Sequence, residues 1–223
     1  MKRTLAAVGI VFVWLMSLNV GVLAQEDTSI FGTNSVSFVP LQVGGGLRGC
    51  TLVYEAVAAD HVYSGGDPVV VVGNIAVHSQ DMNVTLALKI GIRGLLSRDQ
   101  RFQAPIFAYL QTDNSSTAKL RHVSADGDEG SRLFIVRLDD EATKLLAETI
   151  QAGRVTVGFN RKENGLDVLV PVDLTVVNSV VSGSRVVRTR SGDATKQFMK
   201  CVLDVVEGSG LASDHAHRVT SFR

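Results

Sequence analysis

The sequence contains one set of residues with the types needed for acyl-transfer chemistry. Ser64, His61 and Asp67 lie close together, and such side chains form a catalytic triad when they are hydrogen-bonded in series. The chain lacks the Gly-x-Ser-x-Gly turn that presents the serine in many hydrolases. A chain of this size offers such a combination by chance, so we interpret these residues as part of the turn around Gly65 and Gly66.

Two acidic or histidine-rich segments have the residue types of metal ligands. His215 and His217 follow Asp214, and ligands two residues apart can share one face of an extended chain. Without a second ligand pair, such a segment holds a divalent ion weakly. Asp139 to Glu141 is acidic too, but helix capping explains it more simply. We therefore predict no catalytic residue, no cofactor and no metal site, and we do not expect an enzyme.

A mildly basic segment lies near the C-terminus. It contains Arg185, Arg188, Arg190, Lys196 and Lys200. The segment could contact anionic lipid or polysaccharide of a cell envelope. We favour a plainer interpretation, in which these side chains are the solvated face of an edge strand and a helix.

The N-terminus predicts export. Lys2 and Arg3 precede an apolar run from Leu5 to Val20, and Val22-Leu23-Ala24 has the small-residue pattern of a cleavage site. Residues 1–24 therefore read as a secretory signal peptide, with retention as a membrane anchor as the alternative. We expect a periplasmic or secreted protein, and no later segment is long and apolar enough to span a bilayer.

The rest of the chain is long enough for one domain with its own core. The sequence has 22 Lys and Arg against 22 Asp and Glu, and loss of Lys2 and Arg3 would leave 20 against 22. A near-neutral chain argues against a nucleic-acid partner. We expect a single domain at 25–206 and a flexible tail at 207–223. The expected partner is an unknown envelope protein or polysaccharide.

Hydrophobic periodicity predicts a mainly β fold. Val69 to Val72 reads as a central strand, and residues 84–93 alternate between apolar and polar or small side chains. Short strands separated by turns favour an antiparallel β-sandwich. We expect one inserted helix at about 139–152 and a C-terminal helix at about 193–206. We expect residues 25–35 to form a loose segment without regular secondary structure. We expect Gly44 to Gly46 to form a flexible entry to the domain.

The clearest stretch is Arg132 to Leu174. It predicts a buried strand at Leu133–Val136, a helix that ends at Gly153, and a strand at Val155–Phe159. Asn164-Gly165 indicates a tight turn. Alternate residues from Leu166 to Leu174 should then share one buried face. Pro171 lacks an N–H group, so this last strand should lie at a sheet edge or end its pairing at that residue.

The sequence contains two cysteines, Cys50 and Cys201. In an exported chain an even pair suggests one disulfide, and two separate buried thiols are the alternative. A bond between them would fasten the last helix to the start of the sandwich.

The order of elements in 132–174 resembles exported bacterial proteins of the invasion-associated locus B type. In that family an apolar strand, an acidic cap, a Leu-rich helix, a glycine, a strand, a turn and a Val-Pro-Val strand close a small β-sandwich. The matching residues here include Cys50 to Val53 and Val170 to Leu174. The family's early tryptophan and its mid-chain cysteines are missing, and the helix bearing Cys201 is additional.

The resemblance implies a periplasmic, non-enzymatic domain with a role at the envelope or in host contact. The leading functional hypothesis is thus an exported, non-catalytic binding or interaction module. A hydrolase on a β-sandwich scaffold and a self-associating structural envelope protein are the alternatives.

Overall fold

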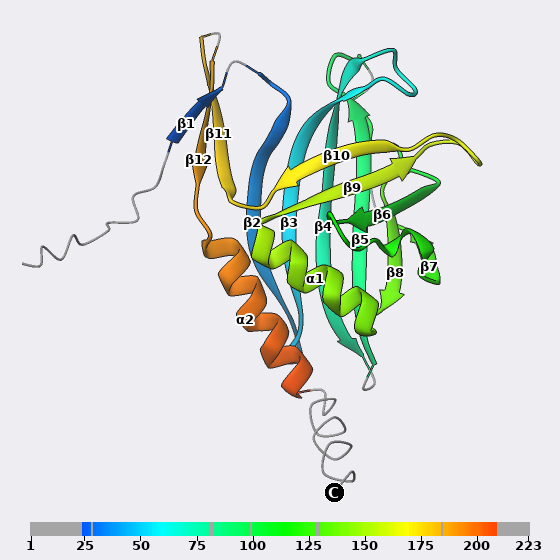
Figure 1. Ribbon diagram of the computed structural model, residues 1–223, viewed down its shortest axis with the longest axis vertical. Helices are drawn as coiled ribbons and strands as arrows, with labels where there is room; N and C mark the ends of the chain where they lie inside the picture. Colours follow the sequence, from blue (N-terminus) through cyan, green and yellow to red (C-terminus); the bar gives the residue numbers. More distant parts are fainter. Residues whose placement is uncertain are drawn as a thin grey trace, which may run out of the picture.

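A large antiparallel sheet organises the molecule. The computed structural model describes residues 24–208, apart from 28, 81–82, 99, 128–129 and 184. The sheet contains β2 (Gly32–Val43), β3 (Gly46–Asp60), β4 (Asp67–Gln80), β5 (Asn83–Gly94), β8 (Arg132–Arg137) and β7 (His122–Asp126), in that spatial order. The first four are long and follow one another as a meander (Figure 1).

Alternating side chains explain why β4 and β5 pair in this register. Ile75 lies opposite Leu88 and Val77 opposite Leu86, and all four are buried. Because successive residues of a strand point to opposite faces, this register places every apolar side chain of the pattern on one face. The predicted central strand and the predicted half-buried strand are both confirmed.

The expectation of a loose segment at 25–35 was wrong at residues 25–27 and 32–35, which lie in strands. Residues 32–43 form β2, which pairs with β3 along most of its length. Gly44 and Gly45 have φ values of 60° and 81° and join the two strands in a tight turn. Two consecutive positive φ values favour glycine, so these glycines serve a hairpin rather than a flexible lead.

A second sheet and two helices cover one side of the large sheet. The second sheet contains β10 (Val168–Asp173), β9 (Arg154–Asn160) and β6 (Phe107–Gln111), in that spatial order. Figure 1 shows β9 and β10 crossing in front of the large sheet, with α1 (Asp140–Ala152) and α2 (Asp193–Gly208) on the same side. The predicted mainly β fold with antiparallel sheets, an inserted helix and a C-terminal helix is confirmed.

The helix α1 ends where the sequence predicts. The Asp139 side chain accepts a hydrogen bond from the Ala142 N–H, so the acidic segment is a helix cap. Gly153 has a φ of 62° and closes the helix in the left-handed conformation. Leu174 N–H then donates to the Gly153 carbonyl, which brings the end of β10 beside the end of α1.

The strand β10 lies at an edge of its sheet, as Pro171 predicts. Val168, Val170 and Val172 are buried, and Leu169 and Pro171 are exposed. Leu166, which we expected on the buried face, is 76% exposed. It lies in the connection before β10, where no strand pairing controls the direction of its side chain.

A third sheet lies beside β2. It contains β1 (Ala24–Asp27), β12 (Arg185–Arg190) and β11 (Val176–Ser182), in that spatial order. In Figure 1 the β11–β12 hairpin rises beside β2 and extends past it. A short 3₁₀ helix, η1 (Thr117–Lys119), follows β6.

One hydrophobic core joins the large sheet, the second sheet and both helices. Leu52 from β3, Phe159 from β9 and Phe198 from α2 belong to it, and each is completely buried. Burying a phenylalanine stabilises a fold by about 1.5–3 kcal/mol. Cys50 and Cys201 are bonded to each other, so the predicted disulfide is present and attaches α2 to β3.

Candidate functional site

The Ser/His/Asp set does not form a triad. Ser64 Oγ donates to Asp60 Oδ2 at 3.3 Å, rather than to His61. Asp60 Oδ1 also accepts the N–H groups of Val62 and Tyr63, at 3.1 and 2.8 Å. The hydroxyl therefore helps to build the β3–β4 turn around a buried carboxylate.

The histidines lie in different places. His78 is on β4, and its partial burial lowers the pKa of the imidazole. His122 is on β7, with its ring 4.9 Å from that of Phe107. His215, His217 and Asp214 lie outside the described residues. Residues 1–23 of the predicted signal peptide lie outside them too. Within the described residues, no three His, Cys, Asp or Glu side chains gather in a way that could hold a metal ion.

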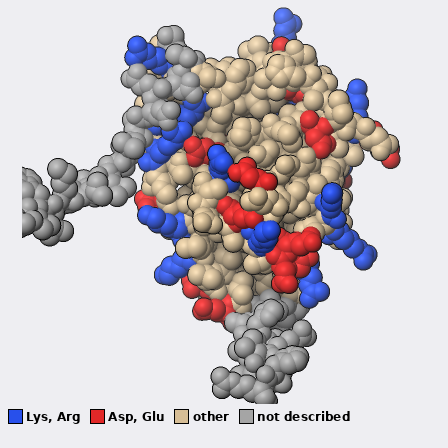
Figure 2. All heavy atoms as spheres, viewed as in Figure 1, with Lys and Arg blue, Asp and Glu red and all other residues tan. Residues whose placement is uncertain are grey.

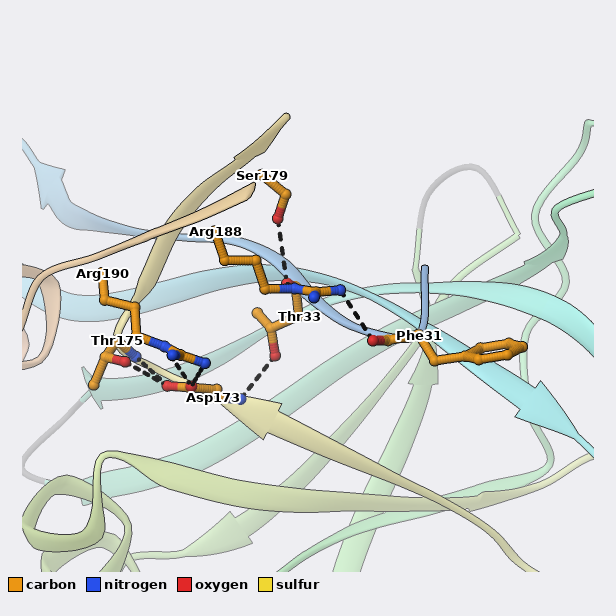
Figure 3. Close-up of polar contacts among 7 residues, drawn as sticks. All are labelled: Phe31, Thr33, Asp173, Thr175, Ser179, Arg188 and Arg190. Atoms are coloured by element: carbon orange, nitrogen blue, oxygen red, sulfur yellow. Dashed lines mark hydrogen bonds and ion pairs between the residues drawn. The ribbon is translucent and has the colours of Figure 1, made fainter. Parts of the chain in front are cut away.

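Arg188 corrects our interpretation of the basic segment as a solvated face. Its side chain is only 4% exposed. Arg188 Nε donates to the Thr33 carbonyl at 3.0 Å, and Nη2 donates to the Phe31 carbonyl at 2.9 Å (Figure 3). Nη2 also donates to the Ser29 carbonyl at 3.2 Å. The arginine thus holds the segment that leads into β2 against β12.

The sequence contained a signal for this burial. Val186 and Arg188 are two residues apart in a strand and therefore point to the same face, and Val186 is buried. A buried guanidinium needs hydrogen-bond acceptors, and the carbonyls of residues 29–33 supply them. Those carbonyls could not be identified from the sequence, because they come from a segment far away along the chain.

Asp173 is the centre of a second polar cluster beside Arg188. Its Oδ2 lies 3.1 Å from Arg190 Nη2, and its Oδ1 accepts from the Thr175 N–H and hydroxyl at 2.9 and 2.6 Å. The Asp173 N–H donates to Thr33 Oγ1 at 2.7 Å. As Figure 3 shows, these contacts join the ends of β10 and β12 to the start of β2.

These side chains border a depression of about 460 Å³. Its wall comes from the segment before β2, the turn after α1, the end of β10 and the strand β12. Three arginines and one aspartate are among the lining residues: Arg154, Arg188, Arg190 and Asp173. The lining therefore has more positive than negative charge, which suits an anionic group.

A second depression of about 230 Å³ adjoins the first. The two share Ala152, Arg154 and Pro171, so together they form one groove, which we call the arginine groove. The second part is lined mainly by amide, hydroxyl and carboxylate side chains from the end of β6, the last turns of α1 and the start of β9. Figure 2 shows acidic and basic side chains interspersed on the face of the molecule that carries the helices.

Arg154 lies where the two depressions meet. Its guanidinium is 3.1 Å from Asp113 Oδ2, and the side chains are 69% and 81% exposed. An ion pair this exposed contributes about 0–1 kcal/mol to stability, so a ligand can displace Asp113 from Arg154 at little cost. We did not identify Arg154 as a site residue from the sequence, because it follows Gly153 directly and reads as the first polar residue of a strand.

In the described part of the chain, no helix has the length and apolar character required to cross a membrane. Comparisons with models of protein families, with curated proteins and with solved structures gave no match. The resemblance to the invasion-associated locus B type was not tested by these comparisons and stays a hypothesis from the motifs alone.

Proposed function

We propose that the protein is an exported, non-catalytic binding module of the cell envelope, and that its ligand occupies the arginine groove. The observation that carries this proposal is the wall shared by the two depressions. Because Ala152, Arg154 and Pro171 line both, an extended ligand can contact a polar part and a basic part at once. Binding sites of proteins are commonly concave surfaces with a few convergent polar groups.

The hydrogen bonds of the groove favour binding over covalent chemistry. The Thr33 hydroxyl is buried and accepts from the Asp173 backbone, and Asp173 itself holds Thr175 and Arg190. A nucleophilic hydroxyl needs an adjacent general base, and in this cluster the carboxylate is already occupied by Arg190. Such a connected network keeps the rim of the groove rigid, which lowers the entropic cost of binding.

Two features support the exported location. The Cys50–Cys201 disulfide is of the kind that forms and persists in oxidising compartments. Residues 1–24 have the charged start, apolar run and small-residue ending of a secretory signal. If the signal is cut after Ala24, N-terminal sequencing of the envelope fraction will begin at Gln25. Intact Met1 in the cytoplasm would contradict export.

The groove can be tested by photo-crosslinking in the cells that produce the protein. A photoreactive residue replaces Gln151, an exposed groove residue, or Glu163, which lies in the connection at the opposite end of β9. We expect a defined adduct from position 151 and none from position 163. Equal adducts from both positions, or none from either, would refute binding in the groove.

A further inference from the structure

We infer that the ligand of the arginine groove is an oligosaccharide that carries carboxylate groups. This inference rests on the proposed function and names the chemical class of the ligand. Three observations lead to it: the polar lining of the smaller depression, the exposed guanidinium at the junction, and the proline in the adjacent edge strand.

The smaller depression is lined by side chains that suit hydroxyl groups. Gln111, Asn114 and Gln151 each carry an amide, which both donates and accepts hydrogen bonds. Glu148 accepts a hydrogen bond from the Thr112 hydroxyl, which fixes the position of its carboxylate. A sugar presents several hydroxyls that each donate and accept, so this mixture of amides and a fixed carboxylate matches it.

The larger depression suits a carboxylate. Arg154 stands between the two depressions, and its guanidinium makes an exposed ion pair with Asp113. A guanidinium binds a carboxylate through two parallel N–H···O bonds, and these are stronger than bonds between neutral groups. An acidic sugar in this position would replace Asp113 as the partner of Arg154.

The edge strand next to the groove argues against an extended peptide. A peptide that binds beside a sheet adds a strand, and it needs the N–H groups of the edge strand. The edge strand here is β10, and Pro171, which has no N–H, lines both depressions.

A titration with a matched pair of sugars tests the inference. The ¹⁵N-labelled protein is titrated with tri-galacturonate and with its methyl ester, which has the same ring hydroxyls but no charge. We expect backbone amide signals to shift at 111–114, 151–156 and 172–175, and we expect the ester to bind at least about fivefold more weakly. Arg154→Gln should weaken tri-galacturonate binding by about tenfold, since it removes a charged hydrogen-bonding pair. Arg137→Gln, an exposed arginine outside the groove, should have no effect.

The other outcomes refute the inference in distinguishable ways. If the ester and tri-galacturonate bind equally well, the groove does not recognise the carboxylates of the sugar. Tighter binding of tri-glutamate at the same signals, with the same dependence on Arg154, would replace the sugar by an acidic peptide. If neither sugar shifts the groove signals while position 151 still gives its crosslinked adduct, the inferred ligand class is refuted. The proposal that the groove binds a ligand is then still supported. Loss of both results would refute the proposed function as well.

Discussion

The completely buried carboxylate of Asp60 lies 3.3 Å from the guanidinium of Arg161. Asp60 ends β3, and Arg161 follows β9, so the pair fastens the β9–β10 connection to the β3–β4 turn. Tyr63 strengthens the same junction, because its hydroxyl donates to the Leu166 carbonyl at 2.6 Å.

Removing the guanidinium should destabilise the fold. Arg161→Met leaves a buried carboxylate without its cation, and loss of one partner of a buried pair costs about 3–5 kcal/mol. Asp60 keeps its hydrogen bonds from the turn, so we expect a loss near 3 kcal/mol in the free energy of unfolding. Denaturant unfolding measures it. Arg132→Met, which breaks an ion pair with a highly exposed Asp126, should cost less than about 1 kcal/mol. Equal losses would contradict this account.

The disulfide should contribute strongly to stability. Cys50 and Cys201 are separated by 151 positions, and the chain-entropy model gives about 5 kcal/mol for a loop of that size. Cys50→Ser and Cys201→Ser should therefore cause similar losses, and the double variant should lose little more than either. Guanidinium unfolding measures all three. If native Cys50 and Cys201 both react with a thiol label, the bond is not formed.

Alkaline pH should destabilise the protein through Tyr109. Its burial, together with the hydrogen bond and charge of Asp167, raises the pKa of the phenol to about 12. The unfolded phenol has a pKa of about 10, so between pH 10 and 12 the unfolded state loses its proton first and gains stability relative to the folded state. The contribution is fully present below pH 10 and is lost as the pH rises towards 12.

This loss can be isolated with one substitution. Between pH 9 and pH 11 the linkage amounts to about 1 kcal/mol for Tyr109. Tyr109→Phe should therefore lose about 1 kcal/mol less than the wild type over that interval, by denaturant unfolding at each pH. Identical pH dependence in the two proteins would show that the Tyr109 phenol titrates normally.

Gly158 should not tolerate a side chain. A Cβ atom at this position would lie 2.3 Å from Cζ of the Tyr109 ring, which packs over the glycine on the adjacent strand. We expect Gly158→Ala to cost about 1–3 kcal/mol from overpacking. Gly46→Ala, where the nearest atom would be 3.7 Å away, is the matched control and should be close to neutral. Adding Tyr109→Ala to Gly158→Ala should relieve the clash, and failure to do so would place the strain elsewhere.

Local patterns in the sequence predicted much of the fold. A run of valines predicted β4, period-two alternation predicted β5 and β9, and the acidic cap with Gly153 predicted both ends of α1. Such features depend on neighbours along the chain. The strand β2 was not predicted. The Gly, Thr, Asn and Ser residues of its first half favour turns locally, and only pairing with β3 makes them a strand.

The arginine groove could not be predicted in the same way. Four separated segments of the chain contribute to its lining, through Thr33, Arg154, Asp173 and Arg188. No local pattern in the sequence indicates that these segments lie side by side. The disulfide was predictable because the chain has only two cysteines and therefore a single possible internal pairing. Residues whose importance depends on long-range contacts need the fold before they can be recognised.

The position of Cys201 sets an order of events for a chain made from its N-terminus. Residues 32–94 can form their meander early, but the thiol of Cys50 has no partner until about 150 further residues exist. At roughly 5–20 residues per second, this interval lasts roughly 8–30 s. During it Cys50 can react with oxidants or with another chain, and α2 is still missing from the surface that it covers later.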